Sequence, residues 1–189
     1  RIRPGTIRWS SSLESFSCWG GEGGAGGVTV ALKDGSTLDA ALLVGADGIF
    51  STVRRQLGLR GDRLNYLGLI VVLGMVPTAG PAGGEGGEGS GDAAAPPLPQ
   101  HRIFETVDGV TRIYAMPFTA TSTMWQLSFP YGEKAARALA KDPAALKAEI
   151  LRRCGAWHEP VPALLRRTPL DCMSGYPVYD RDPLEPEVL

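Results

Sequence analysis

The sequence is short of the side chains that catalyse reactions without a cofactor. It contains two histidines, His101 and His158, and neither stands near a serine or cysteine as a nucleophile and its base would. The three cysteines, Cys18, Cys154 and Cys172, do not combine with the histidines into the ligand spacing of a zinc site. We therefore predict no catalytic side chain and no metal site, and we assign the histidines to surface or hydrogen-bonding roles.

Net charge and long apolar runs are also nearly absent. The formal net charge is −1, which gives no attraction to nucleic acid or to an anionic membrane. The longest apolar run, Leu67–Val76, contains two glycines and is far shorter than the roughly 20 residues that span a bilayer. An odd number of unpatterned cysteines suits free thiols. We predict a cytoplasmic or other reducing soluble compartment, no membrane span and no nucleic-acid partner, with oligomeric state left open.

The chain has enough apolar residues to build a core. Hydrophobic residues make up 43% of its 189 residues and charged residues 21%, which suits one domain or two small ones. The sequence begins at Arg1 instead of a methionine and stops at Leu189 in strand-like sequence. We interpret it as an internal fragment of a longer protein, so organellar targeting stays open.

The most informative stretch runs from Leu42 to Arg55. Three large apolar residues, Leu42–Val44, predict a strand buried on both faces. A turn follows at Asp47-Gly48, where the aspartate can bond to its own backbone and the glycine accepts a positive φ. Ser51 is placed to cap the helix that comes next, and Gly58 to end it.

This stretch resembles the Asp-Gly fingerprint of the FAD-dependent aromatic-ring-type monooxygenases (class A) that share the p-hydroxybenzoate hydroxylase-like fold. The matching positions are Leu42, Leu43, Val44, Gly45, Ala46, Asp47, Gly48, Ser51, Val53 and Arg54. The resemblance implies that Asp47, Gly48, Ser51 and Arg54 border FAD and take part in handling NAD(P)H. The alternative is a purely structural Asp-Gly turn before a capped helix.

Strand patterns precede this turn. Residues 6–19 suggest one or two strands, and alternation at 28–32 predicts a half-buried strand that a hairpin turn joins to a strand at 37–44. Gly21–Gly26 has the G-x-G-x-x-G spacing of a dinucleotide loop. A strand follows it instead of the helix that would hold a pyrophosphate, so we interpret it as a hairpin connection.

After the turn the pattern changes to a second sheet with helices. Strands are predicted at 67–76, 102–107, 111–118 and 123–129, and helices at 133–140, from Pro143 with Asp142 as cap, and at 160–167. The run 79–99 has almost no large apolar residue and is predicted to be a disordered insert. This sheet with its covering helices resembles the family's substrate domain.

The last stretch, residues 176–184, resembles the Asp-Arg-x-Pro segment by which the family's chain returns to its FAD domain, with Pro183 near the flavin. The predicted fold is thus mixed α/β (α+β). Residues 1–63 form a partial FAD-binding domain, 64–175 an antiparallel-sheet substrate domain with the insert at 79–99, and 176–189 the return.

Candidate substrate contacts come from the alternation of two strands. One face of the first carries Arg112 and Tyr114, and one face of the second carries Gln126. We propose these three for a substrate cavity, although a solvated outer face is as consistent with the pattern, and the sequence does not decide between the faces.

The resemblance implies a fragment of an enzyme that uses FAD, NAD(P)H and dioxygen to hydroxylate an organic, aromatic or polycyclic substrate. The fragment alone is expected to be inactive. Two alternatives stay open. One is a related flavoprotein of the halogenase or prenyl-lipid reductase type, and the other is a non-catalytic binding or interaction module derived from the fold.

Overall fold

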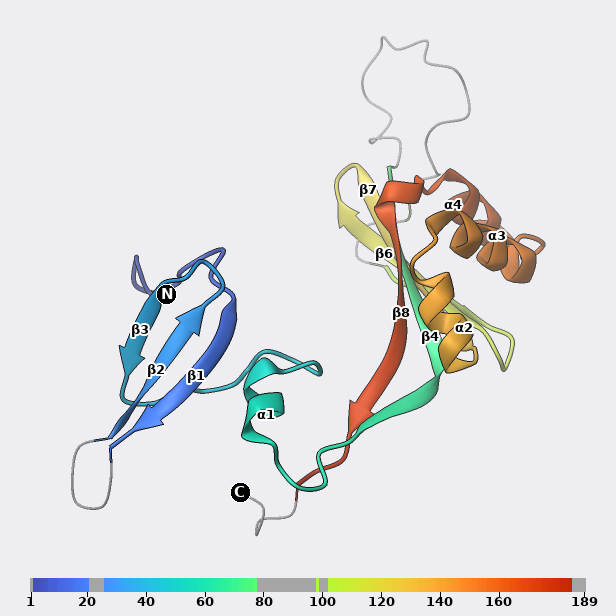
Figure 1. Cartoon of the computed structure of the whole chain (residues 1–189). Helices are drawn as coiled ribbons and strands as arrows, with labels where there is room; N and C mark the ends of the chain where they lie inside the picture. Colours follow the sequence, from blue (N-terminus) through green and yellow to red (C-terminus); the bar gives the residue numbers. More distant parts are fainter. Residues whose placement is uncertain (1, 21–25, 78–97, 99–101, 185–189) are drawn as a thin grey trace. The chain divides into compact units, whose positions relative to one another are not determined.

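The computed structural model describes residues 2–20, 26–77, 98 and 102–184 (Figure 1). The chain divides into two compact units. The first unit combines residues 1–65 with 180–189, and the second contains residues 66–179. His101, the Gly21–Gly26 loop except Gly26, and the insert at 79–99 except Leu98 lie outside the described residues.

The first unit contains a three-stranded antiparallel sheet in the order β1-β2-β3, made of Leu13–Trp19, Gly27–Leu32 and Thr37–Ala40. Alternation along β2 buries Val28, Val30 and Leu32, which confirms the predicted strand. Gly35 in the β2–β3 turn has φ +82°, a conformation that favours glycine. The predicted strand at 6–19 begins only at Leu13.

The buried strand predicted at Leu42–Val44 is wrong. These residues form no strand, Leu42 is 76% exposed and Val44 is 74% exposed. Only Leu43 packs against the β2 core. β3 ends at Ala40 and no described strand pairs with residues 42–44, so their backbone lacks the ladder hydrogen bonds of a strand.

A short helix, α1 (Thr52–Leu57), follows the Asp47 turn and ends at Gly58, which has φ +60° as predicted for a left-handed cap. The Gln56 side chain attaches α1 to the edge strand β1. Its Nε2 donates to the Glu14 carbonyl at 2.8 Å, and its Oε1 accepts from the Phe16 amide at 3.1 Å. One side-chain amide therefore satisfies two of the backbone groups on the edge of β1 that a further strand would have bonded.

The second unit is built on a five-stranded sheet in the order β5-β6-β7-β4-β8. The strands are β4 (Leu64–Pro77), β5 (Phe104–Val107), β6 (Arg112–Thr119), β7 (Ser122–Pro130) and β8 (Met173–Arg181). The β5–β6, β6–β7 and β7–β4 pairs are antiparallel. The predicted boundary between residues 175 and 176 falls inside β8, because that strand continues to Arg181.

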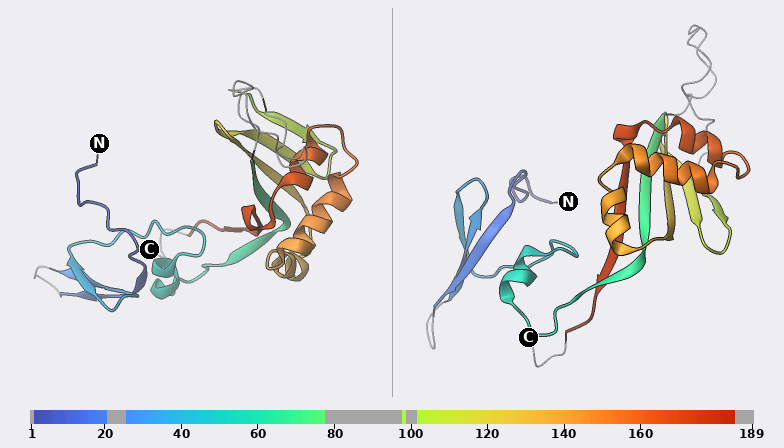
Figure 2. Two further views of the ribbon diagram at one scale, coloured as in Figure 1. Left: turned by 90° about the horizontal axis from the view of Figure 1, so that it is seen from above. Right: turned by 45° about the vertical axis from the view of Figure 1, so that its right-hand side comes forward.

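Three helices lie together on one face of this sheet (Figure 2). They are α2 (Glu133–Leu139), α3 (Pro143–Cys154) and α4 (Val161–Arg167), and a single 3-10 turn, η1 (Leu170–Cys172), leads into β8. Asp142 caps α3 by accepting from the Ala144 and Ala145 amides, as its sequence predicted. The helical stripe of Leu146, Ile150 and Cys154 is fully buried against the sheet.

The helix-covered face carries the core of the second unit. Trp125, Leu127 and Phe129 of β7 and Ile113 and Ala115 of β6 are buried. The alternate residues of the same strands point to the opposite face, which no described helix covers and which we call the open face. The alternation of residues along the strands did not tell which face of the sheet is covered. The position of the helices shows that it is the face of Trp125, Leu127 and Phe129.

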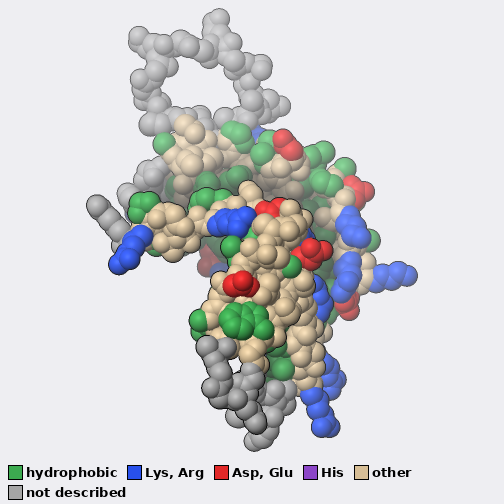
Figure 3. Space-filling view, turned by 60° about the vertical axis from the view of Figure 1, so that its left-hand side comes forward, with side chains coloured by type: hydrophobic (Ala, Val, Ile, Leu, Met, Phe, Trp, Pro, Cys, Tyr) green, Lys and Arg blue, Asp and Glu red, His purple; other side chains and the backbone are tan. Residues whose placement is uncertain are grey.

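Hydrophobic side chains remain visible at the surface in several places (Figure 3). All three cysteines are free thiols, with Cys18 exposed, Cys154 buried and Cys172 partly buried. Within the described ranges no helix has the length and apolar character to cross a membrane.

Candidate functional site

Asp47 is placed by the short helix that follows it. Its Oδ1 accepts from the Ser51 hydroxyl at 2.5 Å, and its Oδ2 accepts from the Thr52 amide at 2.6 Å. Ser51 Oγ in turn accepts from the Arg54 amide at 2.9 Å, so the predicted cap is confirmed. The hydrogen bond from Ser51 lowers the pKa of Asp47, and the bonds from the helix backbone add to this. The first amides of α1 are therefore satisfied within the chain.

Two glycines give the turn its shape. A Cβ on Gly45 would lie 2.8 Å from the Val53 Cβ, so it is the α1 side chain of Val53 that approaches the small residue here. Gly48 has φ +81°, and a Cβ built on it would meet nothing within 4 Å. The turn from Val44 to Phe50 is therefore exposed to solvent, and Val53 of α1 packs close to it at Gly45.

Asp62 joins the two motif segments. Its Oδ1 accepts from Arg54 Nε at 2.7 Å and from Arg181 Nη1 at 2.7 Å. Asp62 and Arg181 are 119 residues apart in the sequence, yet both belong to the first unit. The side chains of Asp62 and Arg181 are only 11% and 15% exposed, so solvent screens this ion pair less than a surface pair.

Further bonds hold the returning segment to the turn. Arg181 Nε donates to the Ile49 carbonyl at 2.8 Å, and Arg54 Nη2 donates to the Asp182 carbonyl at 3.3 Å. Asn65 Nδ2 donates to the Asp182 carboxylate at 3.0 Å. Pro183 follows directly and is exposed. The Asp-Gly turn and the Asp-Arg-x-Pro segment are thus one connected structure.

Substituting Asp62 with asparagine is expected to loosen this structure. Burial raises the pKa of Asp62, but the hydrogen bonds from Arg54 and Arg181 outweigh it and keep the carboxylate ionised. Without that charge, two guanidinium groups face each other unneutralised. Hydrogen exchange around Ile49 and Arg181 should quicken by at least about tenfold, as loss of a bond to a charged group predicts.

The control for this variant is Asp34→Asn. The Asp34–Arg8 pair lies in the same unit, but both side chains are about half exposed (50% and 49%). Mass-spectrometric hydrogen exchange should therefore separate the two variants. Equal exchange in both would show that Asp62 does not hold the segments together.

The predicted substrate residues lie together on the open face of the second unit. Tyr114 Oη donates to Gln126 Oε1 at 3.1 Å across the β6–β7 pair. Arg112 Nε pairs with Glu105 Oε1 at 2.5 Å, and its guanidinium carbon lies 5.3 Å from the centre of the Tyr114 ring. These residues form one polar cluster, and their role toward a substrate stays a prediction.

Sequence reasoning missed Asp62 and Gln56. Each is an ordinary polar residue in its local context, with no motif around it. Their partners, Arg181 for Asp62 and the β1 backbone for Gln56, are distant in sequence. Only a pattern of paired substitutions across relatives could have revealed them from sequence.

The first unit has an exposed surface that a cofactor could contact, but the arginines and helix amides that could bind a phosphate already have partners within the chain. Arg54 and Arg181 are both occupied by Asp62, and the α1 amides are occupied by Asp47 and Ser51. The exposed turn with the unobstructed Gly48 can still lie against a flat or extended group. The residues present thus suit the border of a FAD site. In the described part of the chain, no three acidic, histidine or cysteine side chains group as metal ligands.

No protein-family model matches the chain. Aurachin C monooxygenase/isomerase of Stigmatella aurantiaca is 27% identical over 161 residues, which are 85% of this chain and 36% of that protein. Klebsiella pneumoniae HpxO, in a crystal structure with FAD and uric acid, is 24% identical with a TM-score of 0.65 over 92% of this chain and 39% of that one. PqsL of Pseudomonas aeruginosa, a probable FAD-dependent monooxygenase, is 26% identical with a TM-score of 0.53 over 89% and 40%.

The similarity extends over both units, but the chain spans only 36% to 40% of the length of these three proteins. This chain is mixed α/β with antiparallel sheets, and the match to the HpxO structure covers 92% of it. The chain is therefore similar in fold to part of the FAD-dependent monooxygenases of the p-hydroxybenzoate hydroxylase-like fold, and it covers about two fifths of the length of these proteins.

Proposed function

We propose that this chain is the central part of a monooxygenase that uses FAD, NAD(P)H and dioxygen to hydroxylate an aromatic or polycyclic substrate. The observation that carries the proposal is the Asp62 network. It unites the Asp-Gly turn and the Asp-Arg-x-Pro segment, the two stretches that resemble the flavoenzymes, in one compact unit.

In this proposal the first unit borders FAD. Gly48 presents bare backbone to the cofactor, and Asp47 and Ser51 keep the turn in shape by fixing it to α1. Arg54 and Pro183 border the same site from α1 and from the returning segment. Asp62 acts as a positioning residue, because it touches Arg54 and Arg181 and reaches the turn only through them.

The second unit would supply the substrate-facing wall. Tyr114 donates its proton to Gln126, so its oxygen can still accept a hydrogen bond from a substrate hydroxyl or amide. Arg112 lies beside Tyr114 and is paired with Glu105, so this ion pair offers polar groups to a substrate without net charge. Bound FAD supplies the redox chemistry. The residues of this chain orient the substrate and keep water from it.

The test uses the protein expressed from its complete coding sequence. Purified protein should carry FAD, seen by absorbance, and should consume NAD(P)H and dioxygen when an aromatic substrate is present. Gly48→Val should weaken FAD binding at least about tenfold, which requires a loss of only about 1.4 kcal/mol of binding free energy.

Gly35→Val is the matched control. Gly35 and Gly48 have nearly the same positive φ, +82° and +81°, and a Cβ on either meets nothing within 4 Å. Both variants suffer the same backbone strain, but only Gly48 belongs to the proposed cofactor surface. Equal loss of FAD in both variants, or a complete protein without flavin, would refute the proposal.

A further inference from the structure

Three of the four methionines of the chain form a row on the open face of the second unit. Strand pairing places Met116 of β6 opposite Met124 of β7, and Met124 opposite Met75 of β4. All three alternate with buried residues of their strands, so they share the face that the helices leave uncovered. We call Met75, Met116 and Met124 the methionine row.

The methionine row lies next to the polar cluster. Each methionine has a neighbour two residues away on its own strand and on the same face. These neighbours are also paired, Tyr114 opposite Gln126 and Gln126 opposite Leu73. Two residues of a strand span about 7 Å, so a single small molecule can contact both rows at once. The open face therefore changes from polar to apolar over the width of one ring.

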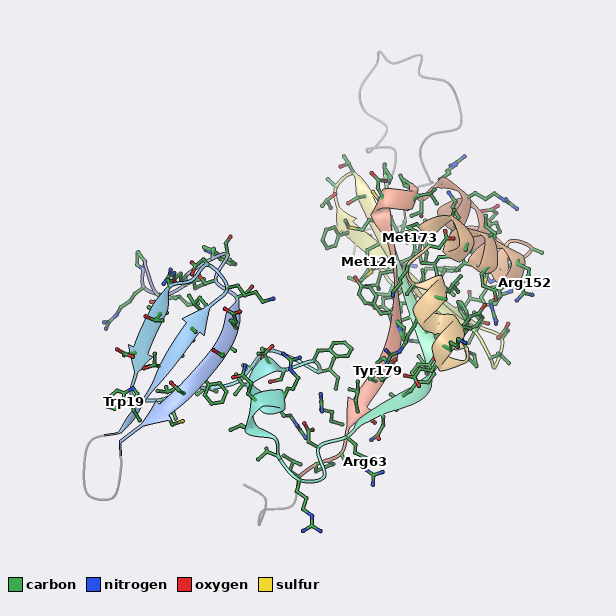
Figure 4. The ribbon with its side chains drawn as sticks, in the orientation of Figure 1. Trp19, Arg63, Met124, Arg152, Met173 and Tyr179 are labelled. Carbon is green, nitrogen blue, oxygen red and sulfur yellow. The ribbon has the colours of Figure 1, made fainter. Side chains whose placement is uncertain are left out.

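The apolar side continues into a groove of about 390 Å³ at the end of the sheet, a volume within the range of ligand pockets. Its lining includes Leu73, Met75, Met124 and Phe118, together with residues of η1 and the first residues of β8. Figure 4 labels Met124 and Met173, which both line this groove. Among the described lining residues only Asp171 is charged, and it is exposed.

A second hollow of about 300 Å³ adjoins the groove and shares Met75, Phe118 and Cys172 with it. The apolar surface is thus longer than a single ring needs. Methionine side chains are unbranched and adaptable, so such a lining accepts flexible apolar groups of varied shape.

We infer that the open face binds an amphipathic substrate. Its polar ring lies over Tyr114 and Gln126, and an uncharged, flexible apolar extension lies along the methionine row into the groove. This inference rests on the proposed function, because it names the substrate class of the same face. The methionines determine specificity and take no part in the chemistry.

The test compares two esters that share one polar ring, methyl 4-hydroxybenzoate and octyl 4-hydroxybenzoate. The full chain labelled with ¹³C at the methionine methyl groups gives one NMR signal for each of its four methionines. The octyl ester should shift the signals of Met75, Met116 and Met124. It should also bind at least about tenfold more tightly than the methyl ester, since burial of two methylene groups suffices for that factor.

Variants of the methionine row refine this test. The double variant Met75→Gln/Met124→Gln should reduce the preference for the octyl ester to below about threefold, whereas replacing both with leucine should preserve it. Leu69→Gln is the matched control, because Leu69 lies further along β4 on the same face and outside the groove. It should keep the full preference.

The possible outcomes distinguish a failure of this inference from a failure of the proposed monooxygenase function. If the methyl ester binds and the octyl ester binds no better, the open face serves a substrate but the amphipathic class is refuted. If neither ester binds, the inference falls, whereas the proposed function is decided separately by the FAD content and NAD(P)H consumption of the complete protein. Methionine shifts that depend on protein concentration and not on ester would show that a second copy of the chain covers the row, which also overturns the inference.

Discussion

Replacing Trp125 with alanine is expected to lower the free energy of unfolding of the second unit by about 3 to 5 kcal/mol. Trp125 has no exposed surface and lies at the centre of the sheet core. Its indole fills the space over Gly74 of the neighbouring strand, where a Cβ would approach the ring to 2.3 Å. An alanine would leave a cavity that two rigid strands cannot close.

The loss has a polar part that can be measured separately. Trp125 Nε1 donates to Thr168 Oγ1 at 2.8 Å, and the hydroxyl of Thr168, the C-cap of α4, donates to the Leu164 carbonyl. Thr168→Val should therefore cost about 1 to 3 kcal/mol, because it leaves the buried indole N–H without a partner. Combining the two substitutions in a double-mutant cycle separates the indole–hydroxyl coupling from the packing of the ring.

Urea unfolding followed by circular dichroism checks these values. Phe118→Ala is the control, since Phe118 is an aromatic residue of the adjacent strand that is 61% exposed, and its loss should change stability by at most about 0.5 kcal/mol. A Trp125→Ala protein as stable as Phe118→Ala would show that the core is not centred on this residue.

Acid is expected to weaken the second unit through Glu149 of α3. Hydrogen bonds from Arg152 lower the pKa of Glu149, burial opposes this, and Arg153 adds to the lowering, so the pKa falls from 4.5 to about 2. Arg153 is held in turn over Phe129, with its guanidinium carbon 4.1 Å from the ring centre. The carboxylate thus connects α3 to the edge of the core.

The direction of the pH dependence follows from the lowered pKa. The unfolded chain takes up a proton at Glu149 near pH 4.5, while the folded chain resists until about pH 2. The stabilisation is therefore complete above pH 4.5 and disappears as the pH falls toward 2. A shift of this size corresponds to about 2 to 3 kcal/mol, allowing for screening of the exposed Arg152.

Glu149→Gln should remove most of this dependence, so that the stabilities of the variant and the parent converge at pH 2. The control is Glu133→Gln, because Glu133 pairs with Arg137 at the same i,i+4 spacing but with both side chains about half exposed (46% and 58%). That variant should lose about 0.3 to 0.5 kcal/mol at pH 7. Urea unfolding from pH 2 to 7 measures both, and parallel curves for Glu149→Gln and the parent would contradict the prediction.

Local features of the fold could be predicted from the sequence. Asp142 and Pro143 marked the start of α3, Ser51 and Gly58 bounded α1, and alternation identified β2, β6 and β7. Each of these depends on residues within one or two turns of the chain, where steric and hydrogen-bonding rules act directly. The likeness of the Asp47 turn to flavoproteins rests on the same short range.

The sequence by itself determined the caps of α1 and α3 and the alternation of residues along β2, β6 and β7. The tertiary structure decided which side chains are buried, which are exposed and which distant residues they contact. It left Leu42 and Val44 exposed and paired with no described strand. It brought Asp62 to Arg181, and it aligned the methionine row through strand register. Register, helix placement and ion pairs between distant residues depend on contacts across the whole fold, and no local pattern in the chain records them.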